Sequence, residues 1–268
     1  MTSSIFYHVD SRILAAMLFM GIIIFYFVGL KVSQYRKKKD STHESLGIGP
    51  FEGAMLGLIS LLLAFTFNQS ASYYNSRREL LMHESNCIGT VLLRSDLYPD
   101  SVREAFRSDL KEYIAARVHY YEVGENEKEI RASLKMASLI SERIWKRAAI
   151  LAQKNDVVVK SMQMVPAIND MIDAVGAREE ARSVHIPETI LWLLFTVCLW
   201  GSFIVGYASK SKKSDWIIIC SYSLFTVMTF YVILDLDQPR SGIIDTSSTH
   251  QGMYDLIDSF QSDSKMDK

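Results

Sequence analysis

Hydrophobic residues are concentrated in four runs along this chain, and charged side chains are nearly absent from them. The first run covers residues 13–30 and contains no charge. Since a helix rises 1.5 Å per residue, a run of this length about crosses the hydrocarbon core of a bilayer. The other runs cover residues 54–67, 190–207 and 216–234, and the second is the shortest. The pattern predicts a polytopic membrane protein with four transmembrane helices.

Basic residues are placed between the runs rather than before the first. A secretory signal has its basic residues before the apolar run, whereas here they follow it, so the first run is predicted to be a retained anchor. The loop at residues 31–50 is rich in lysine and arginine, and the loop at 208–215 contains three lysines. Short basic loops stay in the cytoplasm. We therefore expect both loops to be cytoplasmic, with residues 68–185 and both termini on the outer side.

The segment at residues 68–185 has the pattern of a helical bundle. The second run continues without glycine or proline as far as Gly89, which predicts one long helix that leaves the membrane. Three further helices are expected at residues 101–123, 127–153 and 157–182. Their apolar residues recur at spacings of three and four, so each helix needs a partner face. Pro166 predicts a kink or a break near Met164.

These patterns predict an all-α fold with a defined order of parts. Residues 1–67 contain the first two transmembrane helices, and residues 68–185 form an extramembrane helical domain. Residues 186–235 contain the last two transmembrane helices. The acidic tail at residues 236–268 is expected to be partly disordered.

Composition and motifs exclude several classes of function. The net charge is -1, from 29 basic and 30 acidic residues, which gives no reason to expect nucleic acid as a partner. The three cysteines show no paired spacing, and the six histidines are scattered, so no metal site is predicted. No nucleotide-binding, hydrolase or zinc-protease motif is present. The sequence therefore predicts neither an enzyme nor a bound cofactor.

The second run has the most informative pattern. Ile59, Leu63 and Phe67 are spaced four residues apart and form one bulky stripe along a helix. Such a stripe usually faces lipid or packs in a core. Arranged about an axis with the stripe inward, several copies would instead form a hydrophobic constriction that gates by dewetting. The polar residues Asn68, Gln69 and Ser70 follow directly and would lie next to this pore.

Charged residues follow the fourth run. Asp235, Asp237 and Arg240 come directly after its last apolar residues. Charges in this position often line a path by which ions enter, or they anchor the end of the helix. Both interpretations fit this pattern equally well.

Motifs that are distributed from the second run onward carry a resemblance to a known family. The stretch GLISLLLAFTFNQSASY at residues 57–73 is followed by NSRRE at 75–79. Other matching segments are ESNCIGT at 84–90, NDMID at 169–173, Arg178 with Arg182, HIP at 185–187 and DLDQPRSGI at 235–243. In this combination the chain resembles the bacterial bestrophin-like domain family. It is more distantly similar to the bestrophin ion channels, through the second run and its continuation.

The resemblance implies a bestrophin-like fold and a function in the bacterial inner membrane. It implies a homo-oligomer, with five subunits expected, in which the second transmembrane helix lines a pore for inorganic ions. The neck of bestrophins falls on Ile59, Leu63 and Phe67. The partners would then be the lipid bilayer, further copies of the chain and the ions. The alternative is a non-conducting membrane sensor or scaffold whose helical domain binds a partner.

Overall fold

The computed structural model describes residues 9–39, 49–124, 126–209, 216–238 and 251–266, and no strand occurs in these ranges. The α-helices are α2 (Ser11–Lys39), α3 (Gly49–Ser95), α4 (Asp100–Glu122), α5 (Glu127–Ala152), α6 (Val158–Ser183), α7 (Glu188–Ala208), α8 (Trp216–Asp237) and α9 (Gln251–Met266). A short 3₁₀ helix, Asn155–Val157, precedes α6. The all-α prediction is confirmed.

The chain divides into two compact units. The first, called the membrane unit here, consists of Met1–Tyr74 and His185–Ile244. The second, called the helical unit, consists of Asn75–Val184 and Asp245–Lys268. The helix α3 contributes its N-terminal part to the membrane unit and its C-terminal part to the helical unit.

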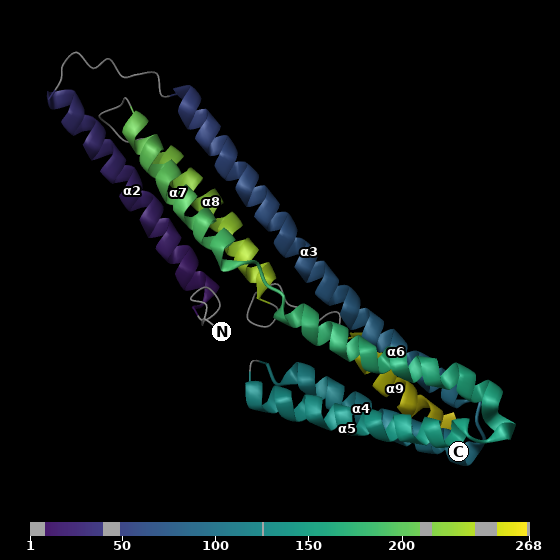
Figure 1. Cartoon of the computed structure of the whole chain (residues 1–268). Coiled ribbons are helices and arrows are strands. Elements are labelled where there is room, and N and C mark those ends of the chain that lie inside the picture. The colour runs from purple at the N-terminus through teal and green to yellow at the C-terminus, as the bar shows by residue number, and fades with distance from the viewer. Residues whose placement is uncertain (1–8, 40–48, 125, 210–215, 239–250, 267–268) are drawn as a thin grey trace. The chain divides into compact units, whose positions relative to one another are not determined.

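The membrane unit contains the four apolar helices that the sequence predicts. α2, α3 and α8, and the α7 segment, are long and apolar enough to cross a membrane. α2 packs closely along α7 and also against α8, and Figure 1 shows α2 and α7 running side by side. The core between these helices consists of aliphatic and aromatic side chains, among them Leu18, Ile22, Leu194, Phe230 and Ile233.

Glycines allow the close approach of α2 and α7. A Cβ atom on Gly29 of α2 would overlap the carbonyl oxygen of Phe203, and one on Gly206 of α7 would overlap that of Tyr26. Small residues at helix crossings are typical of membrane bundles, where backbones approach one another for packing. The hydroxyl of Ser202 donates a hydrogen bond of 2.6 Å to the carbonyl oxygen of Ile22 in the same crossing. The backbones of the two helices therefore lie in direct contact at this crossing.

The helical unit packs α4, α5 and α6 with the C-terminal part of α3. The predicted boundaries of these three helices agree with the observed ones to within a residue or two. Asn126 caps α5, because its side chain accepts hydrogen bonds from the amides of Lys128 and Glu129. The shared core contains Ile88, Phe106, Leu110, Ile114, Ile144, Ile168 and Met171.

Two features of the helical unit differ from the sequence analysis. α6 continues through Pro166 as one helix, so of the predicted kink or break the break is wrong. Met164, Ala167 and Ile168 beside it are buried in the core, and this packing holds both halves of α6 in place. The tail, for which the sequence predicted no helix, contains α9 in the structure. Met253 of α9 is buried in the same core.

Candidate functional site

The membrane-unit part of α3 has a buried face. Ile59 is 2% exposed and packs with Leu63 in the core of the membrane unit. The side chain of Ile59 fills the space above Gly201 of α7, where a Cβ atom would overlap it. Two of the three residues predicted to form a neck therefore contact other helices of their own chain.

The rest of the circumference of this part of α3 is exposed on the single chain, and this exposed face begins beside Leu63, because Phe67 lies one turn further along the same stripe. Phe67, the third residue of the predicted neck, is 41% exposed. The exposed face also carries Phe51, Gly53, Gly57, Leu58, Leu61, Ala64 and Phe65. Only 17% of the apolar window of α3 is buried within the chain, compared with 39% for α2 and 44% for α8. Of these three spans, α3 thus has the largest share of surface left for lipid or for another protein chain.

The polar residues after the predicted neck also lie on different faces. Asn68 and Gln69 are exposed. Ser70 is fully buried, and its hydroxyl donates a hydrogen bond of 2.7 Å to the carbonyl oxygen of Ile233 in α8. Because successive residues of a helix are about 100° apart, only part of a polar triplet can face outward. Ser70 therefore holds α3 against α8.

Of the acidic residues at the end of α8, Asp237 contacts the segment that precedes α7. Asp237 is fully buried, and both of its carboxylate oxygens accept from the amide of Ile186 at 3.2 Å. His185 Nδ1 lies 3.1 Å from the carbonyl oxygen of Asp237. Asp235 accepts a hydrogen bond from the hydroxyl of Tyr231 at 3.2 Å. Arg240 lies outside the described residues. Asp237 thus joins the end of α8 to the segment before α7, and Asp235 bonds within α8.

The helical unit contains a buried charged cluster, formed by Glu84 of α3, Arg117 and Tyr121 of α4, and Arg178 of α6. The side chains of Glu84 and Arg117 have no solvent exposure, and that of Arg178 is 12% exposed. Arg117 donates from Nε to Oε1 of Glu84. Arg178 donates from Nη1 to Oε2 of Glu84 at 2.8 Å, and the hydroxyl of Tyr121 donates to the same oxygen at 3.0 Å. One carboxylate therefore joins three helices.

The protonation states of the residues in this cluster depend on burial and on the charges of their neighbours. Burial alone would raise the pKa of Glu84, but the guanidinium groups of Arg117 and Arg178 outweigh it and hold this pKa below its ordinary value of 4.5. Burial lowers the pKa of Arg117, and the adjacent carboxylate outweighs that effect and raises it. Burial also raises the pKa of Tyr121, which stays a neutral donor. At neutral pH the cluster holds two positive charges and one negative charge.

Sequence reasoning missed this cluster. Glu84 and Arg178 both stand in segments that carry the family resemblance, but nothing in the sequence joined them to Arg117. The three residues lie on three helices with long intervals between them, and no local spacing rule relates such positions. A buried ion pair becomes visible only when the helices are packed.

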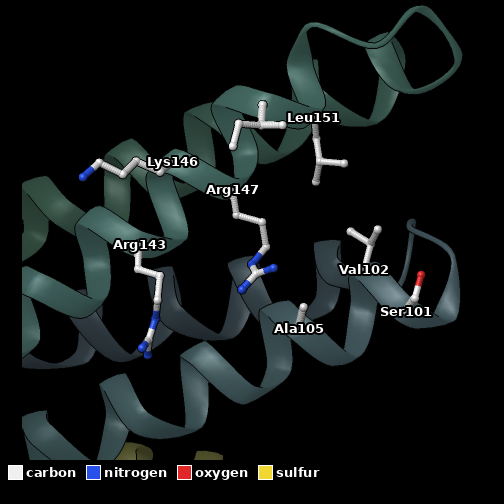
Figure 2. Close-up of a pocket in the computed structure, with 8 residues that line it drawn as sticks. Ser101, Val102, Ala105, Arg143, Lys146, Arg147 and Leu151 are labelled. Carbon is white, nitrogen blue, oxygen red and sulfur yellow. The ribbon is translucent and has the colours of Figure 1, made fainter.

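A second basic group lines a shallow cavity of about 390 Å³ between α4 and α5. Figure 2 shows Arg143, Lys146 and Arg147 of α5 on one side and residues of α4 on the other. Arg143 and Arg147 both pair with Asp109, at 2.9 Å and 2.8 Å, and Lys146 pairs with Glu142 at 2.7 Å. In the described ranges, no group of three His, Cys, Asp or Glu residues could hold a metal ion.

The four apolar helices and the helical unit define an all-helical integral membrane protein. A family model, the Bestrophin-like domain, matches residues 20–250, and the chain therefore belongs to the Bestrophin-like family. This confirms the resemblance found in the sequence. Comparison with curated proteins gives no match.

Solved structures share the fold. A bacterial bestrophin homologue from Klebsiella pneumoniae, solved as a variant, has a TM-score of 0.62 and 12% sequence identity, and the alignment covers 90% of this chain and 98% of that one. A variant of a protein described as a membrane protein has a TM-score of 0.65 and 14% identity, with the same coverage of both chains. The chain thus has the fold of bestrophin-type membrane proteins over nearly the whole length of these neighbours.

Proposed function

We propose that this protein is an oligomeric ion channel of the inner membrane, in which α3 lines the pore between subunits. The observation that carries the proposal is the exposed face of α3, because a pore between subunits must be bounded by residues that are exposed on each single chain. Membership in the Bestrophin-like family supports the channel function. A homopentamer in the lipid bilayer, conducting inorganic ions, is the assembly we propose.

The small residues of the exposed face favour a second copy of the chain as its partner. A Cβ atom on Gly53 or Gly57 would meet no atom within 4 Å, so α3 has no neighbour of its own chain there. Helices of a membrane bundle approach closely where such residues are exposed. Ser60 on this face donates to the carbonyl oxygen of Leu56 in its own helix, so its hydroxyl does not need water.

We propose a hydrophobic constriction within the triad Ile59, Leu63 and Phe67, with Phe67 as the residue that faces the pore. Phe67 supports this because it is the exposed member, and Asn68 and Gln69 beside it would form a polar mouth. A constriction of aromatic rings gates by excluding water. Ile59 and Leu63 would narrow the pore only if α3 turned away from α7 and α8 when the channel assembles.

Conductance of single-residue variants in planar bilayers tests the proposal. Phe67→Ala should raise the single-channel conductance, because a methyl group replaces the ring at the constriction. Phe225→Ala is the matched control, since Phe225 is an exposed phenylalanine of α8, outside the proposed pore. Absence of current from both wild type and Phe67→Ala would contradict the channel and favour the sensor or scaffold. Higher conductance from Ile59→Ala rather than Phe67→Ala would mean that α3 turns.

We also propose that the basic loops face the cytoplasm and that the helical unit lies on the outer side. Cysteines placed at Ser41 and at Ser138, an exposed position of α5, test this in a chain whose native cysteines are replaced by serine. A membrane-impermeant maleimide applied to intact spheroplasts should label the cysteine at 138 and leave the one at 41 unlabelled. Labelling at 41 alone would show the opposite orientation.

A further inference from the structure

The guanidinium group of Arg117 is enclosed by protein and only partly paired. Its Nε donates to Glu84, but among the described residues neither Nη1 nor Nη2 has a hydrogen-bond partner, and both atoms are buried. The side chain has no solvent exposure. A buried donor without a partner costs about 1–3 kcal/mol, and more when it is charged. With both Nη1 and Nη2 unpaired, Arg117 would be stabilised by a hydrogen-bond acceptor at this position.

The charges of the surrounding helices do not supply one. Glu84 of α3 is shared between Arg117 and Arg178, which leaves one positive charge in excess. Glu179 of α6 accepts from the hydroxyl of Tyr120 and pairs with Arg182 at 3.2 Å, and Arg182 is shared with Glu127 of α5 at 3.6 Å; neither glutamate is a partner of Arg117. The phenols of Tyr113 and Tyr121 stay neutral, because burial raises their pKa. A negative charge at the Nη edge of Arg117 would balance the cluster.

We propose that the charged cluster binds one small monovalent anion at the Nη1–Nη2 edge of Arg117. A water molecule would satisfy the hydrogen bonds but would leave the excess positive charge unbalanced in a medium of low polarity. The edge offers several N–H donors in one plane, a geometry that suits a single acceptor or a fork of two oxygens.

The surroundings of the two guanidinium groups are aromatic. The guanidinium carbon of Arg117 lies 4.7 Å from the centre of the Tyr120 ring and 5.8 Å from that of Tyr121. Arg178 lies over the same two rings, at 5.2 Å and 4.2 Å. Because the Arg117 side chain has no solvent exposure and both Nη atoms are buried, an anion bound at this edge would be enclosed by protein, which favours a halide over a bulky organic anion. Its role would be to stabilise the packing of α3, α4 and α6.

Thermal unfolding of the purified full chain in detergent tests the proposal. Chloride titrated against gluconate at constant ionic strength should raise the Tm in a saturable way, by about 2–4 °C for each kcal/mol of binding. In Arg117→Met the remaining pair of Glu84 and Arg178 is balanced, so this response should disappear. Arg147→Met is the control: it also removes a paired arginine of the helical unit and should keep the response. Equal Tm values in chloride and gluconate for wild type, or a response that persists in Arg117→Met, would overturn the proposal.

Anomalous scattering provides a test that does not depend on a folded variant. Crystals of the wild-type full chain grown in sodium bromide should show an anomalous peak within hydrogen-bond distance of Arg117 Nη1 and Nη2. If a peak is present there, the site is an anion site. If no peak is present at this edge while surface bromide sites are visible, the proposal is wrong.

Discussion

Single residues inside the helical unit carry its strongest electrostatic interactions. Glu84 accepts from Arg117, Arg178 and Tyr121, and each of these side chains comes from α4 or α6. Buried ion pairs gain little over apolar packing, but removing one member leaves a buried charge without its partner. The cluster therefore holds α3, α4 and α6 together, and its loss should lower the stability of the helical unit.

Replacement of Glu84 by glutamine should destabilise the helical unit by about 3 kcal/mol, because two buried guanidinium groups would lose their shared carboxylate. Thermal or denaturant unfolding followed by circular dichroism measures the effect. Glu104→Gln is the matched control, since Glu104 is an exposed glutamate of α4, and it should change stability by less than about 0.5 kcal/mol. Equal stability of the two variants would mean that the cluster contributes nothing.

Acid should remove the same contribution. The pKa of Glu84 is lower in the folded chain than its ordinary value of 4.5, so its ionised form stabilises the fold fully above that pH. As pH falls below 4.5 and passes through the lower folded pKa, this stabilisation is lost. The difference in Tm between wild type and Glu84→Gln should therefore be constant from pH 7 to pH 5 and shrink below pH 4.5. A difference that stays constant to pH 3 would contradict this assignment.

At the scale of elements, the membrane unit depends on how closely its helices approach. Gly29 and Gly206 lie at one crossing of α2 and α7, and each faces the backbone of the other helix. The hydrophobic effect supplies little drive between helices in lipid, so close packing and backbone contacts carry more of the stability. The apolar pattern of each run predicts a transmembrane helix, but it does not show which glycines lie where two helices cross.

Alanine at Gly206 should push α2 and α7 apart, because its Cβ would overlap the backbone of Tyr26. We expect a loss of about 2 kcal/mol, within the usual range for overpacking, measured as a lower Tm in detergent. Gly176→Ala is the control: Gly176 lies within α6 with nothing near its Cβ position, and alanine there should stabilise the helix by up to about 1 kcal/mol. A neutral Gly206→Ala would show that the crossing is loose.

At the scale of the whole molecule, the assembly that we propose depends on the exposed face of α3. A face that carries both small residues and phenylalanines can pack against another protein at some positions and border a pore at others. Ile59 and Leu63 on the buried face are occupied by the core of their own subunit. Assembly through the exposed face leaves that core unchanged.

Cysteine cross-linking in membranes tests which face meets a second copy. In a chain whose native cysteines are replaced by serine, Gly57→Cys should form disulfide-linked dimers on mild oxidation, because copies of α3 would lie around one axis. Ile59→Cys should remain monomeric, since this position is buried within the chain. Met17→Cys on the exposed surface of α2 controls for random collision. Cross-links at 59 without cross-links at 57 would contradict the proposed assembly.

The class of this protein and the order of its helices from α2 to α8 follow from the sequence alone, whereas α9 was not predicted. Uncharged runs long enough to cross a bilayer have few folded alternatives, because every backbone polar group in lipid must be bonded within a helix or a closed barrel. The spacing of apolar residues in α4, α5 and α6 likewise requires a partner face and so predicts a bundle. The family motifs could be recognised because each is a continuous segment of sequence, as at residues 57–73 in α3 and 169–173 in α6.

Which face of each helix is buried depends on the packing of the whole chain and could be seen only in the tertiary structure. Ile59, Leu63 and Phe67 form one stripe in sequence, yet the core covers the first two and leaves Phe67 exposed, because the partners of α3 come from helices distant in the chain. The pairing of Glu84 with Arg117 and Arg178 was hidden for the same reason. Local periodicity shows that a helix has a face to bury, whereas the burial of a particular side chain depends on long-range packing.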